Sequence, residues 1–202
     1  MKHYFDSIKP NLVIAVNGGT NKSIKNSITP NIIIGDNDSI RKKSKSQKIK
    51  YPKDKDKNDL DLAIEYLLSN YTNFQLFCFG ILGNRIDHTL SNLNSISKIT
   101  PPPIIIHSKQ TILILNPSFS LKNIPTKTKV SIISLTKFSK VNIKGYKYSG
   151  NYEIPFLSSL GISNIVLNQD NEIHCKEGKI ITIIYLDFIK FYNEGKCYNS
   201  SS

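Results

Sequence analysis

The hydrophobic positions in the first half of the chain fall into short, nearly continuous runs. They occur at residues 11–17, 32–34, 74–80, 104–107 and 111–115. Such runs are typical of strands that are covered on both faces. Between them, residues 20–28, 59–70 and 86–99 are expected to be helical, most clearly 59–70, where apolar side chains recur at helical spacing. The alternation predicts a mainly parallel sheet with helices on both faces over residues 1–117.

The pattern changes after Asn116-Pro117. Short strand-like runs follow at residues 130–136, 141–148, 162–167, 172–175 and 179–186, and turn-forming residues separate them. This spacing is typical of a small all-β unit, and we expect a β-sandwich. The predicted fold is therefore an α/β domain over residues 1–117 and a β-sandwich domain over residues 118–202. The second domain includes an aromatic and polar tail at residues 187–202.

The charge, the hydropathy and the cysteine content of the chain bear on three questions: nucleic-acid binding, membrane insertion and cellular location. The 202 residues carry a net charge of +12, but Arg41 and eight lysines lie within residues 41–57. We interpret this segment as a solvated loop, with the steering of a polyanion as the alternative, and expect no nucleic-acid partner. No apolar run approaches the ~20 residues of a membrane-spanning helix, and the first residues lack the apolar core of a signal peptide. Three cysteines without a CxxC pair favour reduced thiols and a cytoplasmic location.

Two carboxylates directly follow the second apolar run, in the sequence Gly35-Asp36-Asn37-Asp38. In open α/β sheets, ligands bind at the carboxyl ends of the strands. Two acidic groups this close repel each other unless a cation lies between them. Mg²⁺ prefers oxygen ligands and keeps coordination positions open for phosphates, so we expect a magnesium site here.

Other candidate residues lie at the ends of other predicted strands and at helix starts. Gly18 and Gly19 follow the first strand, where they allow a phosphate to approach the backbone, although a plain strand-to-helix turn explains them equally well. Asp59 is compatible with a metal ligand or with a simple helix-start carboxylate. Arg85 can bind phosphate oxygens in a bidentate way. His88, beside Asp87, fits acid–base chemistry or a capping role.

Four blocks contain these residues: Asn17-Gly18-Gly19-Thr20-Asn21, Gly35-Asp36-Asn37-Asp38-Ser39, Lys55-Asp56-Lys57-Asn58-Asp59 and Leu82-Gly83-Asn84-Arg85-Ile86-Asp87-His88-Thr89-Leu90-Ser91-Asn92. In this order and spacing they resemble the motifs of the thiamine pyrophosphokinase (thiamin diphosphokinase) family. Lys144-Gly145-Tyr146-Lys147-Tyr148 and Ile162-Ser163-Asn164 are similar to that family's G-x-K-Y and S-N segments. The resemblance covers about residues 10–186.

The chain departs from the family pattern at four positions. The family usually has Asp at the position of Asn17, Thr at Asn58, Lys at Leu62 and Gly at Asn84. Asn17 keeps a carbonyl oxygen but loses a charge, which weakens any role as a metal ligand. Leu62 removes a cation that could have contacted a carboxylate or a phosphate. We interpret these changes as drift in a working enzyme.

The resemblance implies that ATP and thiamine give thiamine diphosphate and AMP. It implies an ATP-binding α/β domain, a thiamine-binding β-sandwich, and a homodimer with the active site across the interface. We assign Asp36, Asp38 and Asp59 to Mg²⁺, and Arg85 and Asp87 to catalysis. ATP would contact Asn17, Gly18, Gly19, Asn21, Asp56, Arg85 and His88. Thiamine would contact Ser163 and Asn164.

Three alternatives remain open. The first is another ATP-dependent diphosphotransferase with a different hydroxyl acceptor. The second is a thiamine-binding homologue with weakened catalysis, for which Asn17 is the best argument. The third is a basic RNA-binding protein that uses residues 41–57. The third is disfavoured because it leaves the ordered carboxylate blocks unexplained.

Overall fold

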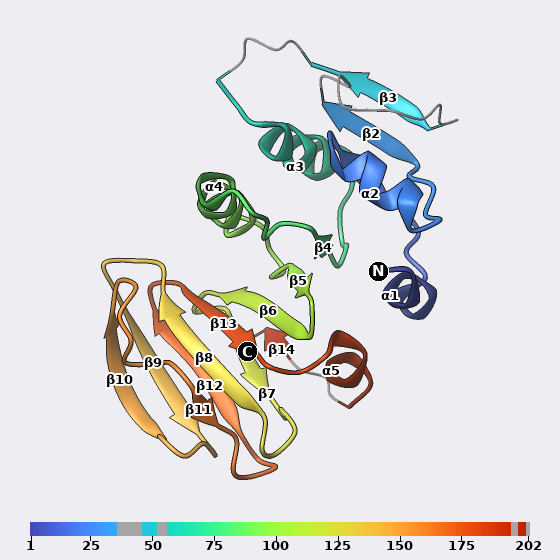
Figure 1. Cartoon of the computed structure of the whole chain (residues 1–202). Helices are drawn as coiled ribbons and strands as arrows, with labels where there is room; N and C mark the ends of the chain where they lie inside the picture. The colour runs from blue at the N-terminus through green and yellow to red at the C-terminus, as the bar shows by residue number, and fades with distance from the viewer. Residues whose placement is uncertain (36–45, 52–55, 195–197, 201–202) are drawn as a thin grey trace. The chain divides into compact units, whose positions relative to one another are not determined.

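The computed structural model describes residues 1–35, 46–51, 56–194 and 198–200 (Figure 1). The chain divides into two compact units. Unit 1 contains residues 1–74 and 87–96, and unit 2 contains residues 75–86 and 97–202. Among the described residues, no helix is both long enough and apolar enough to cross a bilayer.

Unit 1 is built on a small parallel sheet. Its strands are β1 (Ile14–Val16), β2 (Ile32–Gly35) and β3 (Gln47–Lys50), in the order β1-β2-β3. Both strand pairs are parallel, with Ile14 opposite Ile32 and Ile32 opposite Gln47. The helices of the unit are α1 (Lys2–Ile8), α2 (Gly19–Lys25), α3 (Asp59–Asn70) and α4 (Ile86–Ile96), whose first residue belongs to unit 2.

Helix α3 packs on this sheet through its apolar stripe (Figure 1). Leu62 and Ala63 form a buried cluster with Ile32 and Ile34 of β2. The family-atypical Leu62 is only 8% exposed, so its side chain belongs to the core of unit 1. A lysine would have to remove its charge from water at this position, which explains why an apolar residue suits it.

Unit 2 consists of two larger sheets. One has five strands in the order β10-β9-β12-β7-β14, all paired antiparallel. The other has six strands in the order β11-β8-β13-β6-β5-β4, in which only β4 and β5 pair in parallel. The strands are β4 (Phe77–Phe79), β5 (Ile104–His107), β6 (Gln110–Leu115), β7 (Phe119–Lys122), β8 (Lys129–Ser134), β9 (Phe138–Lys144), β10 (Gly150–Pro155), β11 (Asn164–Ile165), β12 (Glu172–Glu177), β13 (Ile180–Ile184) and β14 (Tyr198–Ser200).

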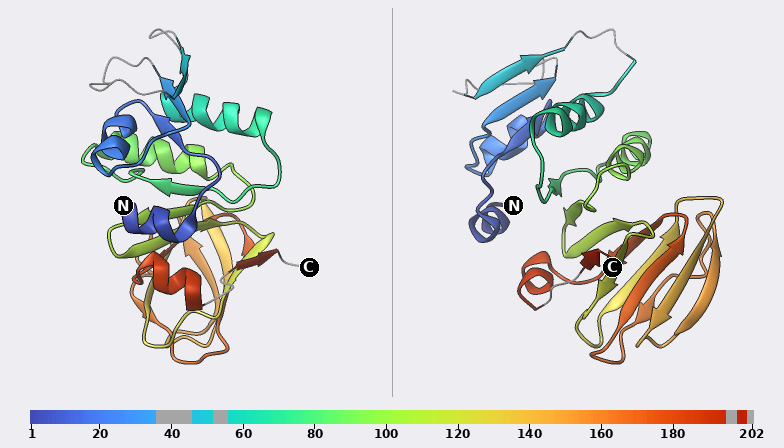
Figure 2. Two further views of the ribbon diagram at one scale, coloured as in Figure 1. Left: turned by 90° about the vertical axis from the view of Figure 1, so that its right-hand side faces the viewer. Right: turned by 180° about the vertical axis from the view of Figure 1, so that it is seen from behind.

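The two sheets of unit 2 lie against each other, and helix α5 (Phe188–Glu194) lies beside β6 (Figure 2). Buried side chains from both sheets fill the interior, among them Val130 and Ile132 of β8 and Val141 and Ile143 of β9. Phe188 of α5 is 1% exposed, and its ring meets that of Phe77 edge to face. The tail therefore contains a packed helix.

The structure confirms a mixed α/β protein with several sheets, but it corrects the strand grouping. The apolar runs of residues 1–117 do not form one mainly parallel sheet. Strands β1–β3 form one sheet, whereas β4, β5 and β6 join the β-rich strands of the second half. The compact units are residues 1–74 with 87–96 and residues 75–86 with 97–202, and the division into functional domains at residues 1–117 and 118–202 stays a prediction. Periodicity identifies a buried strand, but it does not identify the sheet that the strand joins.

Candidate functional site

Asn17 lies at the carboxyl end of β1 with its backbone held on both sides. Its N–H donates to the carbonyl of Ile34 at 2.9 Å, and its carbonyl accepts from the N–H of Thr20 at 3.0 Å. Its φ of 41° is left-handed, a conformation that Asn tolerates better than most residues. Gly35 of β2 packs against it, because a Cβ built on Gly35 would lie 3.2 Å from the Asn17 Cβ. The direction of the Asn17 side chain is thus fixed by its surroundings.

The paired glycines open the space beside this turn. Gly18 and Gly19 are exposed, and a Cβ added to either would meet nothing within 4 Å. Thr20 is fully buried, and its hydroxyl oxygen has no hydrogen-bond partner among the described residues. Asn21 is half-buried in the first turn of α2. The space where a side chain would stand at residues 18 and 19 is therefore open.

Hydrogen bonds join three of the four sequence blocks within unit 1. The Asn17 amide Nδ2 donates to Asp59 Oδ2 at 2.9 Å, across 42 residues of chain. Asn58 caps α3 by accepting from the Asp61 N–H at 2.8 Å, and its Nδ2 donates to Ser91 Oγ at 3.1 Å. The first, third and fourth blocks therefore meet at the carboxyl end of β1 and the amino end of α3.

The remaining polar candidates differ in how much the structure describes. Asp36 and Asp38 lie outside the described residues. Asp56 is exposed, and the neighbouring Lys57 forms an ion pair with Glu65. Arg85, Asp87 and His88 are exposed. Asp87 lies in the first turn of α4, where the helix dipole favours a carboxylate. Arg85 belongs to unit 2. Among the described residues, no group of three His, Cys, Asp or Glu side chains is arranged to hold a metal ion.

The two predicted thiamine contacts lie next to each other but differ in exposure. Ser163 is exposed in a left-handed turn with φ of 60°, and its N–H donates to Ser131 Oγ at 3.0 Å. Asn164 is only 4% exposed. Its Oδ1 accepts from the Tyr148 N–H at 3.0 Å, and its Nδ2 donates to the Tyr148 carbonyl at 2.9 Å. The Asn164 amide thus clamps the main chain of the G-x-K-Y segment.

That segment is also held by a neighbouring turn. Gly145 has φ of 78°, and a Cβ there would lie 2.5 Å from the Asp170 carbonyl oxygen, so only glycine fits. Lys144 Nζ donates to Asp170 Oδ2 at 2.6 Å, and this hydrogen bond lowers the pKa of the Asp170 carboxyl below its usual value. The turn around residues 168–171 therefore holds the chain at Lys144 and Gly145, where it leaves β9.

Exposed apolar side chains surround these residues along the chain. Tyr148 is 55% exposed, and the others are about half exposed or more; they are Phe156, Leu157, Leu160, Ile162 and Leu167. Exposed apolar side chains gathered in one segment are typical of an interaction surface. No sequence motif singled this feature out, because isolated apolar residues between turns look like ordinary strand positions.

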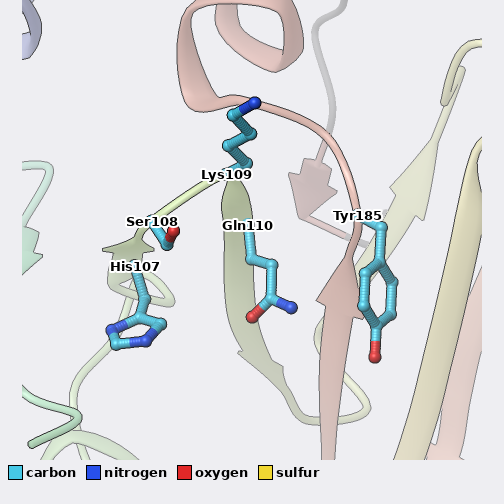
Figure 3. A pocket seen from close by; sticks show the side chains of 5 residues that line it. All are labelled: His107, Ser108, Lys109, Gln110 and Tyr185. Atoms are coloured by element: carbon cyan, nitrogen blue, oxygen red, sulfur yellow. The ribbon is translucent and has the colours of Figure 1, made fainter.

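Unit 2 also contains an open cavity of about 510 Å³ (Figure 3). Its lining comes from the β5–β6 hairpin and the end of β13, namely His107, Ser108, Lys109, Gln110 and Tyr185. None of the described residues that the sequence predicts for the site lines it. Lys129 Nζ lies 4.3 Å from the centre of the Tyr185 ring. The lining residues follow no recognisable spacing, so no pattern in the sequence predicts this cavity.

Both halves of the chain match family models of one protein class, and together the two matches cover most of the length of the chain. Residues 5–107 match the thiamin pyrophosphokinase catalytic domain, and residues 118–180 match the thiamin pyrophosphokinase vitamin B1 binding domain. The chain therefore belongs to the thiamin pyrophosphokinase family, and the family predicted from its motifs is confirmed.

Individual relatives agree with this assignment. A thiamine pyrophosphokinase from Bacillus subtilis is 29% identical over 185 residues, covering 85% of this chain and 86% of that protein. Thiamin pyrophosphokinase 1 from Caenorhabditis elegans is 31% identical over 113 residues, covering 50% of this chain and 46% of that protein.

Solved structures agree as well. A crystal structure of the Bacillus subtilis thiamine pyrophosphokinase superposes with a TM-score of 0.77 at 25% identity, covering 91% of this chain and 92% of that chain. The thiamin pyrophosphokinase from Candida albicans has a TM-score of 0.72 at 17% identity, covering 89% and 82% respectively, and shows the shared fold.

Proposed function

We propose that this protein transfers the diphosphoryl group of ATP to the hydroxyl of thiamine, giving thiamine diphosphate and AMP. The observation that carries the proposal is the pair of hydrogen bonds Asn17–Asp59 and Asn58–Ser91, at 2.9 and 3.1 Å. They bring together blocks that are far apart in the sequence. A chance similarity of motifs gives no reason for these blocks to meet.

Diphosphoryl transfer leaves little covalent work to the protein, so positioning and electrostatics should dominate. The open backbone at Gly18 and Gly19 supports a phosphate-binding role for this turn, with Asn21 nearby. Arg85 would bind the transferred group, and Asp87 would assist a metal ion or accept the proton of the attacking hydroxyl. Asp56 and His88, whose side chains are both exposed, would also contact ATP.

The described residues fit a magnesium ion by their donor chemistry. Asp59 supplies a carboxylate, and the buried Asn17 Oδ1 has no hydrogen-bond partner among the described residues. Both are hard oxygen donors of the kind that Mg²⁺ prefers. Asp36 and Asp38 would complete the set. When bound, Mg²⁺ would neutralise charge on the phosphates, which is worth several kcal/mol in such reactions.

We assign nucleotide binding to the stretch 1–117 and thiamine binding to a β-sandwich in the stretch 118–202. Ser163 would contact the aminopyrimidine ring directly, since its side chain is exposed. Asn164 would contribute mainly by holding Tyr148, because its amide already bonds to that main chain at 3.0 and 2.9 Å.

A homodimer is the partner that we propose for the exposed apolar side chains of the 148–167 segment. Leu157 and Leu160 are 56% and 57% exposed, which is unfavourable in water and favourable at an interface with a second copy. Light scattering should give twice the monomer mass, and Leu160→Lys should shift it toward the monomer. A cytoplasmic location is supported by the free thiols of Cys78 and Cys175.

An assay for AMP, with and without thiamine and Mg²⁺, tests the reaction. AMP should form only when ATP, thiamine and Mg²⁺ are all present, and Asp38→Asn should abolish it while the circular dichroism spectrum stays native. AMP release with another alcohol in place of thiamine would indicate a different diphosphotransferase. Thiamine binding without AMP would indicate a homologue with weakened catalysis. Salt-sensitive RNA binding that disappears when the lysines of 41–57 are neutralised would support the basic RNA-binding alternative.

A further inference from the structure

In the contact between Asn17 and Asp59, the amide of Asn17 donates the hydrogen bond and the carboxylate of Asp59 accepts it. An ionised carboxylate only accepts hydrogen bonds, so the amide nitrogen of Asn17 must face Asp59 Oδ2, 2.9 Å away. The amide oxygen then faces the opposite way, where it is buried without a hydrogen-bond partner among the described residues. The orientation of this amide is therefore set by Asp59.

Both partners are anchored by other parts of unit 1. Asn17 is held through its own N–H and carbonyl, which bond to Ile34 and Thr20. Asp59 is the first residue of α3, whose end is capped by Asn58. Because neither residue is free to move away, the hydrogen bond fixes the direction of the Asp59 carboxylate relative to the carboxyl end of β1.

An aspartate at position 17 would change the sign of this interaction. Two carboxylates would then meet at hydrogen-bond distance, and they would repel each other unless a cation or a proton lay between them. The asparagine instead makes a charge-assisted hydrogen bond, which is attractive with no cation present. The residue found in this chain therefore makes the arrangement of Asp59 independent of a bound metal.

We propose that Asn17 is a positioning residue that holds Asp59 in its working orientation in the absence of Mg²⁺, at the expense of affinity for the free ion. The inference rests on the proposed function for the role of Asp59, but the contact itself does not depend on it. The amide oxygen remains as a neutral ligand, so the site has one negative charge fewer than with an aspartate. Free Mg²⁺ should bind more weakly as a result.

Thermal unfolding of the full chain, in EDTA and in 10 mM Mg²⁺, tests the positioning role without any turnover. The wild-type Tm should hardly respond to Mg²⁺. Asn17→Asp should have a lower Tm in EDTA and recover it in Mg²⁺, and titration calorimetry should show at least about tenfold tighter Mg²⁺ binding. Asn17→Ala should have a lower Tm than the wild type by a similar amount in both buffers, since it removes the hydrogen bond without adding charge.

Asn31→Asp is the matched control. It adds the same charge in unit 1, and its side-chain oxygen can still accept from the Val13 N–H, as Asn31 does at 2.8 Å. It should not acquire a Mg²⁺-dependent Tm. The proposal is overturned if Asn17→Asp responds to Mg²⁺ no more than Asn31→Asp, if it fails to fold even in Mg²⁺, or if Asn17→Ala matches the wild-type Tm.

Steady-state kinetics separates this proposal from the proposed reaction. At saturating Mg²⁺, Asn17→Ala should lower kcat more than it raises the KM for thiamine, and Asn17→Asp should restore kcat to the wild-type value or above. A wild-type protein without activity would defeat the proposed reaction, yet the unfolding experiment would still decide the role of Asn17. A kcat unchanged in Asn17→Ala would overturn the positioning role even if the enzyme is active.

Discussion

Replacement of Asn164 by alanine should destabilise the protein measurably, because this amide holds a main chain in place. Its side chain accepts from the N–H groups of Tyr148 and Ile165 at 3.0 and 2.9 Å and donates to the Tyr148 carbonyl at 2.9 Å. Alanine removes all three hydrogen bonds and leaves partly buried groups unpaired. At about 1 kcal/mol per hydrogen bond, the loss should be roughly 2–4 kcal/mol.

For a chain of this length, 1 kcal/mol corresponds to about 2–4 °C in Tm, so the expected drop is roughly 4–16 °C. Differential scanning calorimetry measures it. Asn142→Ala is the control, because among the described residues the Asn142 side chain donates only to the side chain of Asn151, in an exposed hydrogen bond of 3.1 Å. That change should stay within about 0.5 kcal/mol. If Asn164→Ala unfolds at the same temperature as Asn142→Ala, the clamp that we describe does not contribute to stability.

Three further predictions concern other positions. Ser163→Ala should raise the KM for thiamine about fivefold, the value of one lost hydrogen bond, and leave the KM for ATP unchanged; an equal rise in both would argue against a thiamine contact. Gly178→Ala should lower the Tm by more than about 4 °C, because a Cβ at φ of 83° would lie 2.5 and 2.7 Å from neighbouring oxygens, and an unchanged Tm would contradict this. Burial raises the pKa of the Cys78 thiol to about 12 and that of Cys175 to about 11. Both should stay protonated at pH 8, and peptide mapping should find them alkylated by iodoacetamide only after unfolding; labelling in the native protein would refute their burial.

The sequence predicted individual elements well where side-chain periodicity is strong. The helix expected over residues 59–70 is α3, Asp59–Asn70, and the strand expected over residues 104–107 is β5, Ile104–His107. Elements with a weak or mixed pattern were missed. Strand β10 at Gly150–Pro155 has only one buried residue, and α5 at Phe188–Glu194 lies in a stretch that looked like a polar tail.

The site could be predicted only in part, for a physical reason. Motif spacing identified Asn17 and Asp59 as candidates, and the structure brings them within 2.9 Å of each other. Motif spacing could not reveal the contacts of Asn164. The hydrogen-bond partners of this side chain are the main-chain N–H and carbonyl of Tyr148, and every residue except proline has both groups. A side chain that bonds to main-chain groups does not restrict the residue type of its partner, so the sequence shows no sign of the contact. Whether the remaining candidates take their assigned roles stays a prediction.

The family-atypical residues Asn17 and Leu62 are best understood together. Relative to the family pattern, Asn17 removes a negative charge and Leu62 removes a positive one. Positions 59 and 62 are one turn apart on α3, so both changes act near the same carboxylate. With Asp and Lys, positions 17, 59 and 62 would carry one net negative charge, and with Asn and Leu they carry the same net charge on Asp59 alone. Where the family pattern has two opposite charges, this chain has a hydrogen bond at Asn17 and a core contact at Leu62. The summed formal charge of the three positions is therefore the same as in the family pattern, although position 17 itself contributes one negative charge fewer to the metal site.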